Sequence, residues 1–229
     1  MNTRWLVGII VIILIIVLGW YLFMTPTGTG ENATSTATST QMGTTSGQTQ
    51  SDGTITFAVP ADFGMATDPQ QILVSAYIPP CNSDFSYCLY YNGTAYQDTN
   101  FEAAGLRIAK RADISGEQSC LNTAPEGFDA STTPSQTANA DAYSTSVFPD
   151  VGDAGAGHTA AGKLYRLYVK SNSSCYEFET RIGNTQYGNY PTGTIQEFTT
   201  ADRAALQNEL NAILKSVTLG TTAVAFPGI

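Results

Sequence analysis

An unbroken apolar run is the strongest pattern in the chain, and it covers residues 5–23, WLVGIIVIILIIVLGWYLF. As an α-helix this run would be roughly 28 Å long, close to the ~30 Å hydrocarbon core of a bilayer. Trp5 and Trp20 stand near its two ends, where tryptophan is enriched at membrane interfaces. The run is longer than the apolar core of a cleaved signal peptide, and no small-residue cleavage motif follows it. It predicts a retained transmembrane helix.

The basic residues around this run predict its orientation. Arg4 precedes the run, whereas the next Lys or Arg is Arg107. Because basic flanks stay on the cytoplasmic side, we expect a cytoplasmic N-terminus and an extracytoplasmic body. The predicted location is therefore the cell membrane, crossed once. The formal net charge of -9 argues against nucleic acid as a partner.

Composition divides the chain into four parts. Residues 1–24 form the cytoplasmic end and the anchor. Residues 25–53 are biased to Thr, Ser, Gly and Gln and lack the apolar side chains that a core needs, so they predict a disordered linker. Residues 54–219 are long enough for one domain with a substantial core. We expect residues 220–229 to be a flexible tail.

Runs with strand-like composition recur through the predicted domain, separated by Gly, Pro, Asn and Ser. They are TITFAVP from Thr54, ILVSAYIP from Ile72, YCLYYN from Tyr87, AGLRIAKR from Ala104, AYSTSVFP from Ala142, KLYRLYVK from Lys163 and CYEFETRI from Cys175. Residues 126–141 are small and polar, which predicts a long loop.

The last two of these runs predict a β-hairpin connected by residues 171–174. Its register would place Lys170 opposite Cys175 and Arg166 opposite Glu179, with one apolar face and one mixed face. Arg166 and Glu179 would then form a cross-strand ion pair. If exposed, it would contribute less than about 1 kcal/mol.

A helix closes the predicted domain. Thr199 or Thr200 can cap it, and Asp202 lies in its first turn. Its apolar residues recur along one stripe: Leu206, Leu210, Ile213, Leu214 and Val217. Strands followed by a helix predict an α+β fold, in which an antiparallel sheet carries the C-terminal amphipathic helix.

All four cysteines follow the predicted membrane span, in a compartment where disulfides form. Of the three connectivities we favour Cys81–Cys88, which brackets a turn, and Cys120–Cys175, which ties the middle of the chain to the hairpin. From loop-closure entropy, these bonds would stabilise the fold by about 2.5 and about 4 kcal/mol, respectively. The spacing lacks any CxxC pair, so we expect no metal at the cysteines.

Candidate chemistry is sparse, and we expect no cofactor. His158, the only histidine, lies in a Gly/Ala-rich segment that predicts a flexible loop and includes Asp150 and Asp153. A histidine with two carboxylates can bind a divalent metal or act as acid and base, but the glycines also suit a plain turn. Glu177 and Glu179 alternate on one strand, which is typical of a solvated face and, less often, of a catalytic pair.

Tyrosine is the residue type with binding potential. The candidates are Tyr90, Tyr91, Tyr96, Tyr187 and Tyr190, which occur among Asn, Gln and Asp residues. Such rings can stack on sugars or contact a peptide when they are exposed. The alternative is packing within the core and across strands.

Several segments of the sequence resemble those of a known family. The segments IPPC, YCLYYNGTAYQDTNFEAAGLRI, AGAGHTAAGKLYRLY, SCYEFETRIG and ALQNELNAILKSVTL resemble membrane-anchored bacterial extracytoplasmic proteins with a PsbP/Mog1-like α+β domain. This resemblance implies a single antiparallel sheet flanked by helices, and it carries no site residues.

Together these features predict a membrane-anchored extracytoplasmic binding or envelope-associated module. Its candidate partners are a cell-wall glycan or an envelope protein. The alternative is a cell-envelope hydrolase or transpeptidase that uses His158 with nearby acids, although no known catalytic motif is present.

Overall fold

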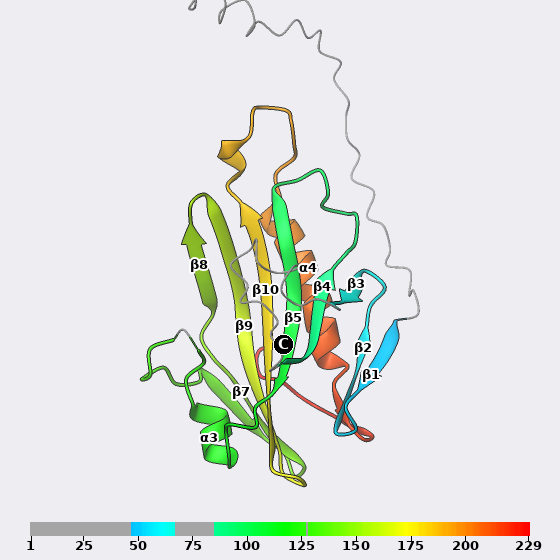
Figure 1. Cartoon of the computed structure of the whole chain (residues 1–229), viewed down its shortest axis with the longest axis vertical. Coiled ribbons are helices and arrows are strands. Elements are labelled where there is room, and N and C mark those ends of the chain that lie inside the picture. The colour runs from blue at the N-terminus through cyan, green and yellow to red at the C-terminus, as the bar shows by residue number, and fades with distance from the viewer. Residues whose placement is uncertain (1–46, 67–84, 127) are drawn as a thin grey trace, which may run out of the picture. The chain divides into compact units, whose positions relative to one another are not determined.

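In the part of the chain that the structure describes, the main elements are a large antiparallel sheet, a small sheet and one long helix (Figure 1). The computed structural model describes residues 47–66, 85–126 and 128–229, which all belong to a unit spanning residues 44–229. Among these residues no helix has the length and apolarity to cross a bilayer. The predicted membrane span, the predicted strand from Ile72 and Cys81 lie outside the described residues.

The elements follow one another with most strands before the long helix. They are β1 (Gln48–Ser51), β2 (Ile55–Val59), β3 (Phe63–Met65), β4 (Phe85–Tyr91), β5 (Phe101–Lys110), α3 (Glu117–Asn122), β6 (Gln136–Asn139), β7 (Tyr143–Val147), β8 (Val151–Gly155), β9 (His158–Val169), β10 (Ser174–Thr185), η2 (Tyr187–Asn189), α4 (Thr200–Lys215), β11 (Thr218–Leu219) and β12 (Thr222–Ala223). The expectation of a sheet-rich α+β fold is confirmed.

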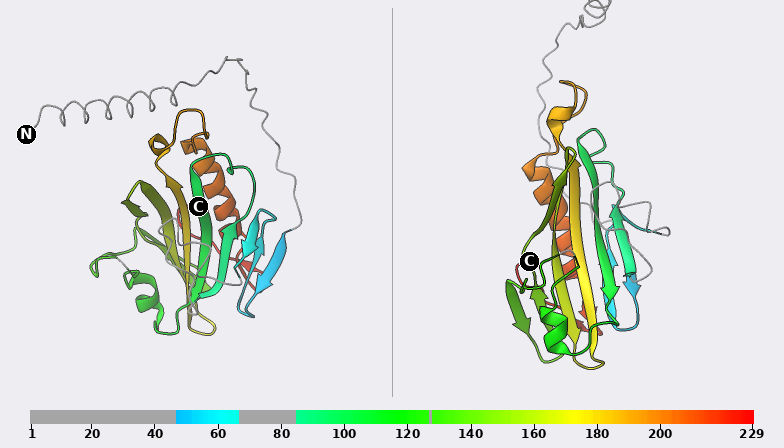
Figure 2. Two further views of the ribbon diagram at one scale, coloured as in Figure 1. Left: turned by 45° about the horizontal axis from the view of Figure 1, so that its top comes forward. Right: turned by 60° about the vertical axis from the view of Figure 1, so that its left-hand side comes forward.

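The sheets are both antiparallel. The large one has the order β3-β4-β5-β10-β9-β7-β6, with β8 also paired to β9, and the small one has the order β1-β2-β11-β12. Two sheets replace the single sheet that the family resemblance implied. Figure 2 shows α4 running alongside the long central strands β5 and β10.

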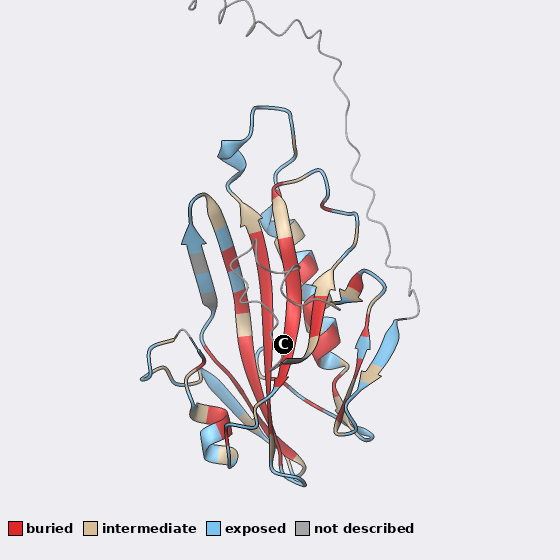
Figure 3. Ribbon diagram, in the orientation of Figure 1, coloured by how far each residue is buried: buried red, intermediate tan, exposed pale blue. Residues whose placement is uncertain are grey.

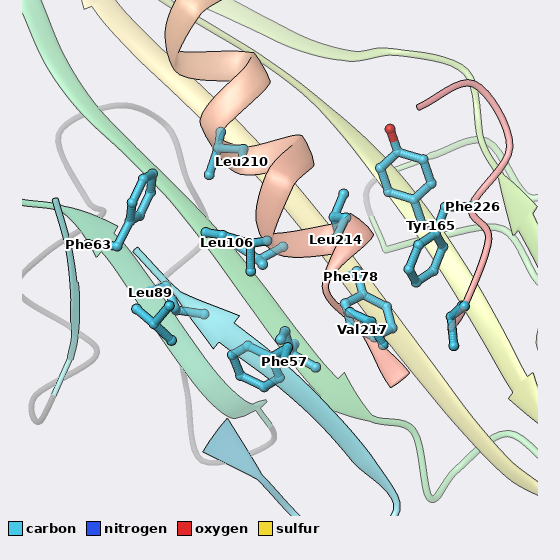
Figure 4. Packing of buried hydrophobic residues seen from close by; sticks show 14 of the residues in the cluster. Phe57, Phe63, Leu89, Leu106, Tyr165, Phe178, Leu210, Leu214, Val217 and Phe226 are labelled. Carbon is cyan, nitrogen blue, oxygen red and sulfur yellow. The ribbon is translucent and has the colours of Figure 1, made fainter. Parts of the chain in front are cut away.

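Helix α4 covers the apolar face of the large sheet, as its sequence predicts. Thr199 and Asp202 form a reciprocal capping box at its start. The predicted stripe is buried along its whole length, and Leu210, Leu214 and Val217 pack with Phe57 and Phe178 (Figure 4). Burial of this stripe holds the helix on the sheet.

The hairpin of β9 and β10 has the predicted faces but a different register. Tyr168 lies opposite Cys175 and Arg166 opposite Glu177, a shift of two residues from the prediction. A shift by two keeps every side chain on its predicted face. The connecting turn begins at Lys170, and Ser173 takes a positive φ of 55° there. The predicted pair Arg166–Glu179 is therefore wrong, and its replacement is described below.

Four segments expected to be irregular contain regular structure. Residues 126–141 contain β6, which pairs with β7, and the His158 segment forms the β8–β9 hairpin rather than a flexible loop. The folded unit is also wider than residues 54–219. Strand β1 lies in the predicted linker, and the predicted tail contains β12 and the buried residues Val224 and Phe226. Short polar strands such as β6 lack the alternation on which prediction depends.

Disulfide Cys120–Cys175 joins α3 to β10 across 55 residues, as predicted. Its Cα atoms lie 5.6 Å apart. Ile114, Leu121 and Tyr168 surround it in a small buried cluster. Helix α3 therefore covers the face opposite α4. Cys88, on β4, is also disulfide-bonded; its pairing with Cys81 stays a prediction.

Gly162→Ala is expected to destabilise the fold by about 1–3 kcal/mol. A Cβ at Gly162 would lie 1.7 Å from the carbonyl oxygen of Thr180, so the backbone of β9 or β10 must move. Gly152→Ala on β8 is the control, because its Cβ would meet only the carbonyl oxygen of Ala160 at 3.7 Å. Urea unfolding of both variants measures the difference; equal stability would contradict this packing.

Candidate functional site

His158 and a glutamate from another strand form the centre of the candidate site. The Nδ1 atom of His158 lies 2.9 Å from Oε2 of Glu102. The side chains are partly accessible, with 33% of His158 and 15% of Glu102 exposed. A carboxylate at one ring nitrogen orients the imidazole.

A β-bulge brings Glu102 to this position. Gly183 pairs with Ala103 but the next residue, Asn184, pairs with Phe101, so Glu102 is an extra residue on β5. Such a bulge redirects a side chain relative to its neighbours on the strand. His158 reaches the same place from β9, where it pairs with Thr185 of β10. Strand β10 therefore separates the two strands that supply the pair.

The loop after β10 adds two exposed tyrosines to this end of the sheet. Tyr187 and Tyr190 are 39% and 38% exposed, and residues 186–194 of this loop are all exposed (Figure 3). The hydroxyl of Tyr190 lies 2.9 Å from Oγ1 of Thr185, the residue opposite His158. The amide of Gln186 donates to the carbonyl of Gly157 at 2.6 Å. These bonds hold the loop against the β8–β9 turn.

The other predicted binding tyrosines take part in packing. Tyr96 is 8% exposed and lies against Phe101 and Phe198, with ring centroids 5.5 and 5.1 Å away. Tyr91 lies 5.5 Å from Tyr96, and burial raises its pKa to about 12. Tyr90 packs on Gly64, where an added Cβ would lie 2.6 Å from its ring. The alternative of core and cross-strand packing describes these three rings.

The aspartates near His158 in sequence have different places in the fold. Asp150 lies 3.7 Å from the ammonium of Lys163, just before β8, whereas the β8–β9 register places Gly155 opposite His158. Five residues of strand separate Asp150 from that end, which is roughly 17 Å. Asp153 pairs through its backbone with Ala160. In the described part of the chain, no three His, Cys, Asp or Glu side chains gather as a metal site would require.

Glu177, considered as a catalytic carboxylate, is held in buried ion pairs. Its Oε2 lies 2.5 Å from Nη2 of Arg166 and 2.9 Å from Nη1 of Arg111. Arg166 is fully buried, and burial lowers its pKa although Glu177 acts in the opposite direction. Glu177 is thus a structural counter-ion and not part of a solvated face.

Glu179, two residues further along β10, has the same role. It pairs with Arg107 and accepts a hydrogen bond from Nε of Arg181 at 2.7 Å. Burial lowers the pKa of Arg107 to about 10, although Glu177 acts in the opposite direction. Because both carboxylates are occupied by guanidinium groups, neither is placed for acid–base chemistry on a substrate.

Comparisons with known proteins show similarity to solved structures. No protein-family model matches the chain, and no curated protein matches it. A solved structure described as "LpqN involved in cell envelope biogenesis of Mycobacterium tuberculosis" has a TM-score of 0.37 and 13% sequence identity to this chain. The matched region covers 78% of this chain and 86% of that one. No residue role follows from this similarity.

Proposed function

We propose that the chain is an envelope-associated, extracytoplasmic binding module, and that its ligand site is the end of the large sheet formed by His158, Glu102, Tyr187 and Tyr190. The ligand class that suits this surface is a glycan. Aromatic rings cover the apolar faces of a sugar, while carboxylate, imidazole and amide groups bind its hydroxyls. The predicted anchor, residues 5–23, would keep this surface at the membrane.

One observation carries the proposal. Across the described residues, the large apolar side chains that are strongly exposed are Met65, Tyr187 and Tyr190, and two of these three lie in one short loop. Exposed aromatics beside convergent polar groups are typical of recognition surfaces. Their hydroxyls contact Thr185 and the carbonyl of Ile195, which fixes the rings before a ligand arrives.

The test is a titration of the full chain, reconstituted in nanodiscs, with soluble cell-wall oligosaccharides. Replacing both Tyr187 and Tyr190 by Ala is expected to weaken binding at least about 30-fold, because truncation of even one central aromatic typically costs about 2 kcal/mol. Met65→Ala is the matched control and should leave affinity unchanged. Unchanged affinity in the tyrosine variant would refute the site, and absence of binding by the unaltered chain would refute the ligand class.

The His158–Glu102 pair favours a second candidate, a cell-envelope hydrolase. In this reading Glu102 orients the imidazole, which accepts a proton from an attacking hydroxyl or water. Glu102→Gln keeps the shape of the pair but removes its charge. It is expected to lower turnover of a wall substrate while oligosaccharide affinity changes less than about threefold. Equal loss of affinity and turnover would assign the pair to binding alone.

A further inference from the structure

A groove of about 280 Å³ lies between α4 and the sheet, and Tyr187 and Tyr190 are not among the residues that line it. Its floor and walls are small and apolar, with Ala161 from β9, Ile182 from β10 and Ala204 from α4. Three charged residues line it as well: Asp150, Lys163 and Arg203. The groove thus combines an apolar interior with two cations and one anion.

The sequence of β9 explains why the space is open. Tyr165, Leu167 and Val169 lie on one face of β9 and are buried in the core. Ala161 and Lys163 continue the same alternating face, but Ala161 is exposed and Lys163 only half-buried. Small residues on both sides, Ala161 and Ala204, leave the volume that larger side chains fill further along β9.

Arg203 lies over the ring of Phe198, with its guanidinium carbon 5.7 Å from the ring centroid. Its Nη1 donates to the carbonyl of Ile182 at 3.1 Å, and its Nη2 donates to Oδ1 of Asn184. Both acceptors are neutral, and no carboxylate of the described residues forms an ion pair with Arg203. Burial lowers the pKa of Arg203. A guanidinium has five N–H donors, so two hydrogen bonds leave others available to a ligand.

Lys163 adds a second positive charge to the same groove. Its side chain is 38% exposed, and its ammonium lies 3.7 Å from Oδ1 of Asp150, whose side chain is 77% exposed. This loose contact is of the kind that contributes little and can rearrange. With Arg203 and Lys163 against Asp150, the groove is positive within a chain whose net charge is -9.

We propose that this groove binds a free, single-chain amphiphilic carboxylate, such as a medium-chain fatty acid. The carboxylate would pair with Arg203 and Lys163, and the hydrocarbon chain would lie over Ala161, Ile182 and Ala204. The charge complementarity selects an anion, and the apolar interior selects a hydrocarbon chain over a simple inorganic anion. The volume is below the usual range for larger ligands, which favours one short chain.

The test uses a diazirine-tagged octanoate with the full chain in nanodiscs of neutral phospholipid. After photolysis, mass spectrometry should map the label to β9 and to residues 200–207 of α4. Unlabelled octanoate should compete, and each CH₂ removed from the competitor should weaken competition roughly fourfold. Labelling by the uncharged amide analogue at the same efficiency would overturn the role of the cations.

Three variants of α4 make the assignment specific. Ala204→Leu fills the groove and is expected to abolish labelling, whereas Ala205→Leu, at an exposed position outside the groove lining, should leave it intact. Arg203→Gln should reduce labelling about tenfold or more, because a charge-assisted hydrogen bond is lost. Equal labelling of both leucine variants would refute binding of the carboxylate in the groove.

A last arm distinguishes the source of the carboxylate. The same diazirine is placed on the acyl chain of a phospholipid within the nanodisc. Weaker groove labelling from this lipid than from free octanoate supports a soluble ligand. Stronger labelling from the lipid would overturn the proposal in favour of contact with the bilayer.

Discussion

Glu177→Gln is expected to lower the free energy of unfolding by about 3–5 kcal/mol, the usual cost of breaking a buried ion pair from one side. Glu177 contacts both Arg166 and Arg111, and its side chain is 8% exposed. The amide removes the negative charge but leaves Arg166 fully buried with its positive charge. The remaining guanidinium then lacks the counter-ion that offsets its desolvation. Urea unfolding followed by circular dichroism measures the loss.

Two further variants test whether the loss of stability comes from the unpaired charge at the Glu177 ion pairs. Asp113→Asn removes the other acidic partner of Arg111, but 64% of the Asp113 side chain is exposed, so it should cost less than about 1 kcal/mol. Replacing Glu177 and Arg166 together by Leu and Met should recover much of the loss, because no charge remains unpaired. If Glu177→Gln costs no more than Asp113→Asn, the ion pairs do not support the sheet.

Local sequence pattern was sufficient for the elements that bury an apolar face. The α4 stripe, its Thr199 cap and the alternation in β9 and β10 are signals within a few residues of one another, and the structure has all of them. Polar strand β6 carries no such signal. Strand β6 forms by pairing with β7, and the sequence of β6 alone does not specify that partner.

The mixed face of the hairpin shows why burial is harder to predict than alternation. Glu177 was expected on a solvated face and Arg166 in a cross-strand ion pair with Glu179, because alternation alone cannot say what covers that face. Helix α3, which is only six residues long, covers it with help from the disulfide. The two-residue error in register follows from the same limit, since a shift by two leaves the pattern of faces unchanged.

The candidate site was predicted only in part. Tyr187, Tyr190 and His158 were identified by residue type, and all three lie at one end of the sheet. Glu102 was missed because the bulge that directs it toward His158 forms between β5 and β10, strands far apart in sequence. The groove at Arg203 was missed for a similar reason. Small residues on two elements create it, and neither segment is unusual alone.

Removal of the Cys120–Cys175 disulfide is the other change with a large expected effect. Replacing both cysteines by Ala should lower the free energy of unfolding by about 4 kcal/mol, because the bond closes a loop of 55 residues in the unfolded chain. That loop holds β6 to β9, so the bond links α3 to the central strand β10 across much of the large sheet. Thermal and urea unfolding, compared with the unaltered protein, measure the loss.

The loss of stability should also be localised to one part of the structure. Cys120 and Cys175 are nearly completely buried with Ile114, Leu121 and Tyr168, and α3 is too short to be stable without this contact. Hydrogen exchange in the double Ala variant should therefore rise first in α3, while α4, on the opposite face, keeps its protection. The second predicted bond, Cys81–Cys88, is the control: its short loop gives about 2.5 kcal/mol and should not affect α3. One contradicting result is that removal of either bond alone lowers the free energy of unfolding by the same amount. The other is that α3 keeps its hydrogen-exchange protection without Cys120. In either case the disulfide does not hold the helix over the buried charges.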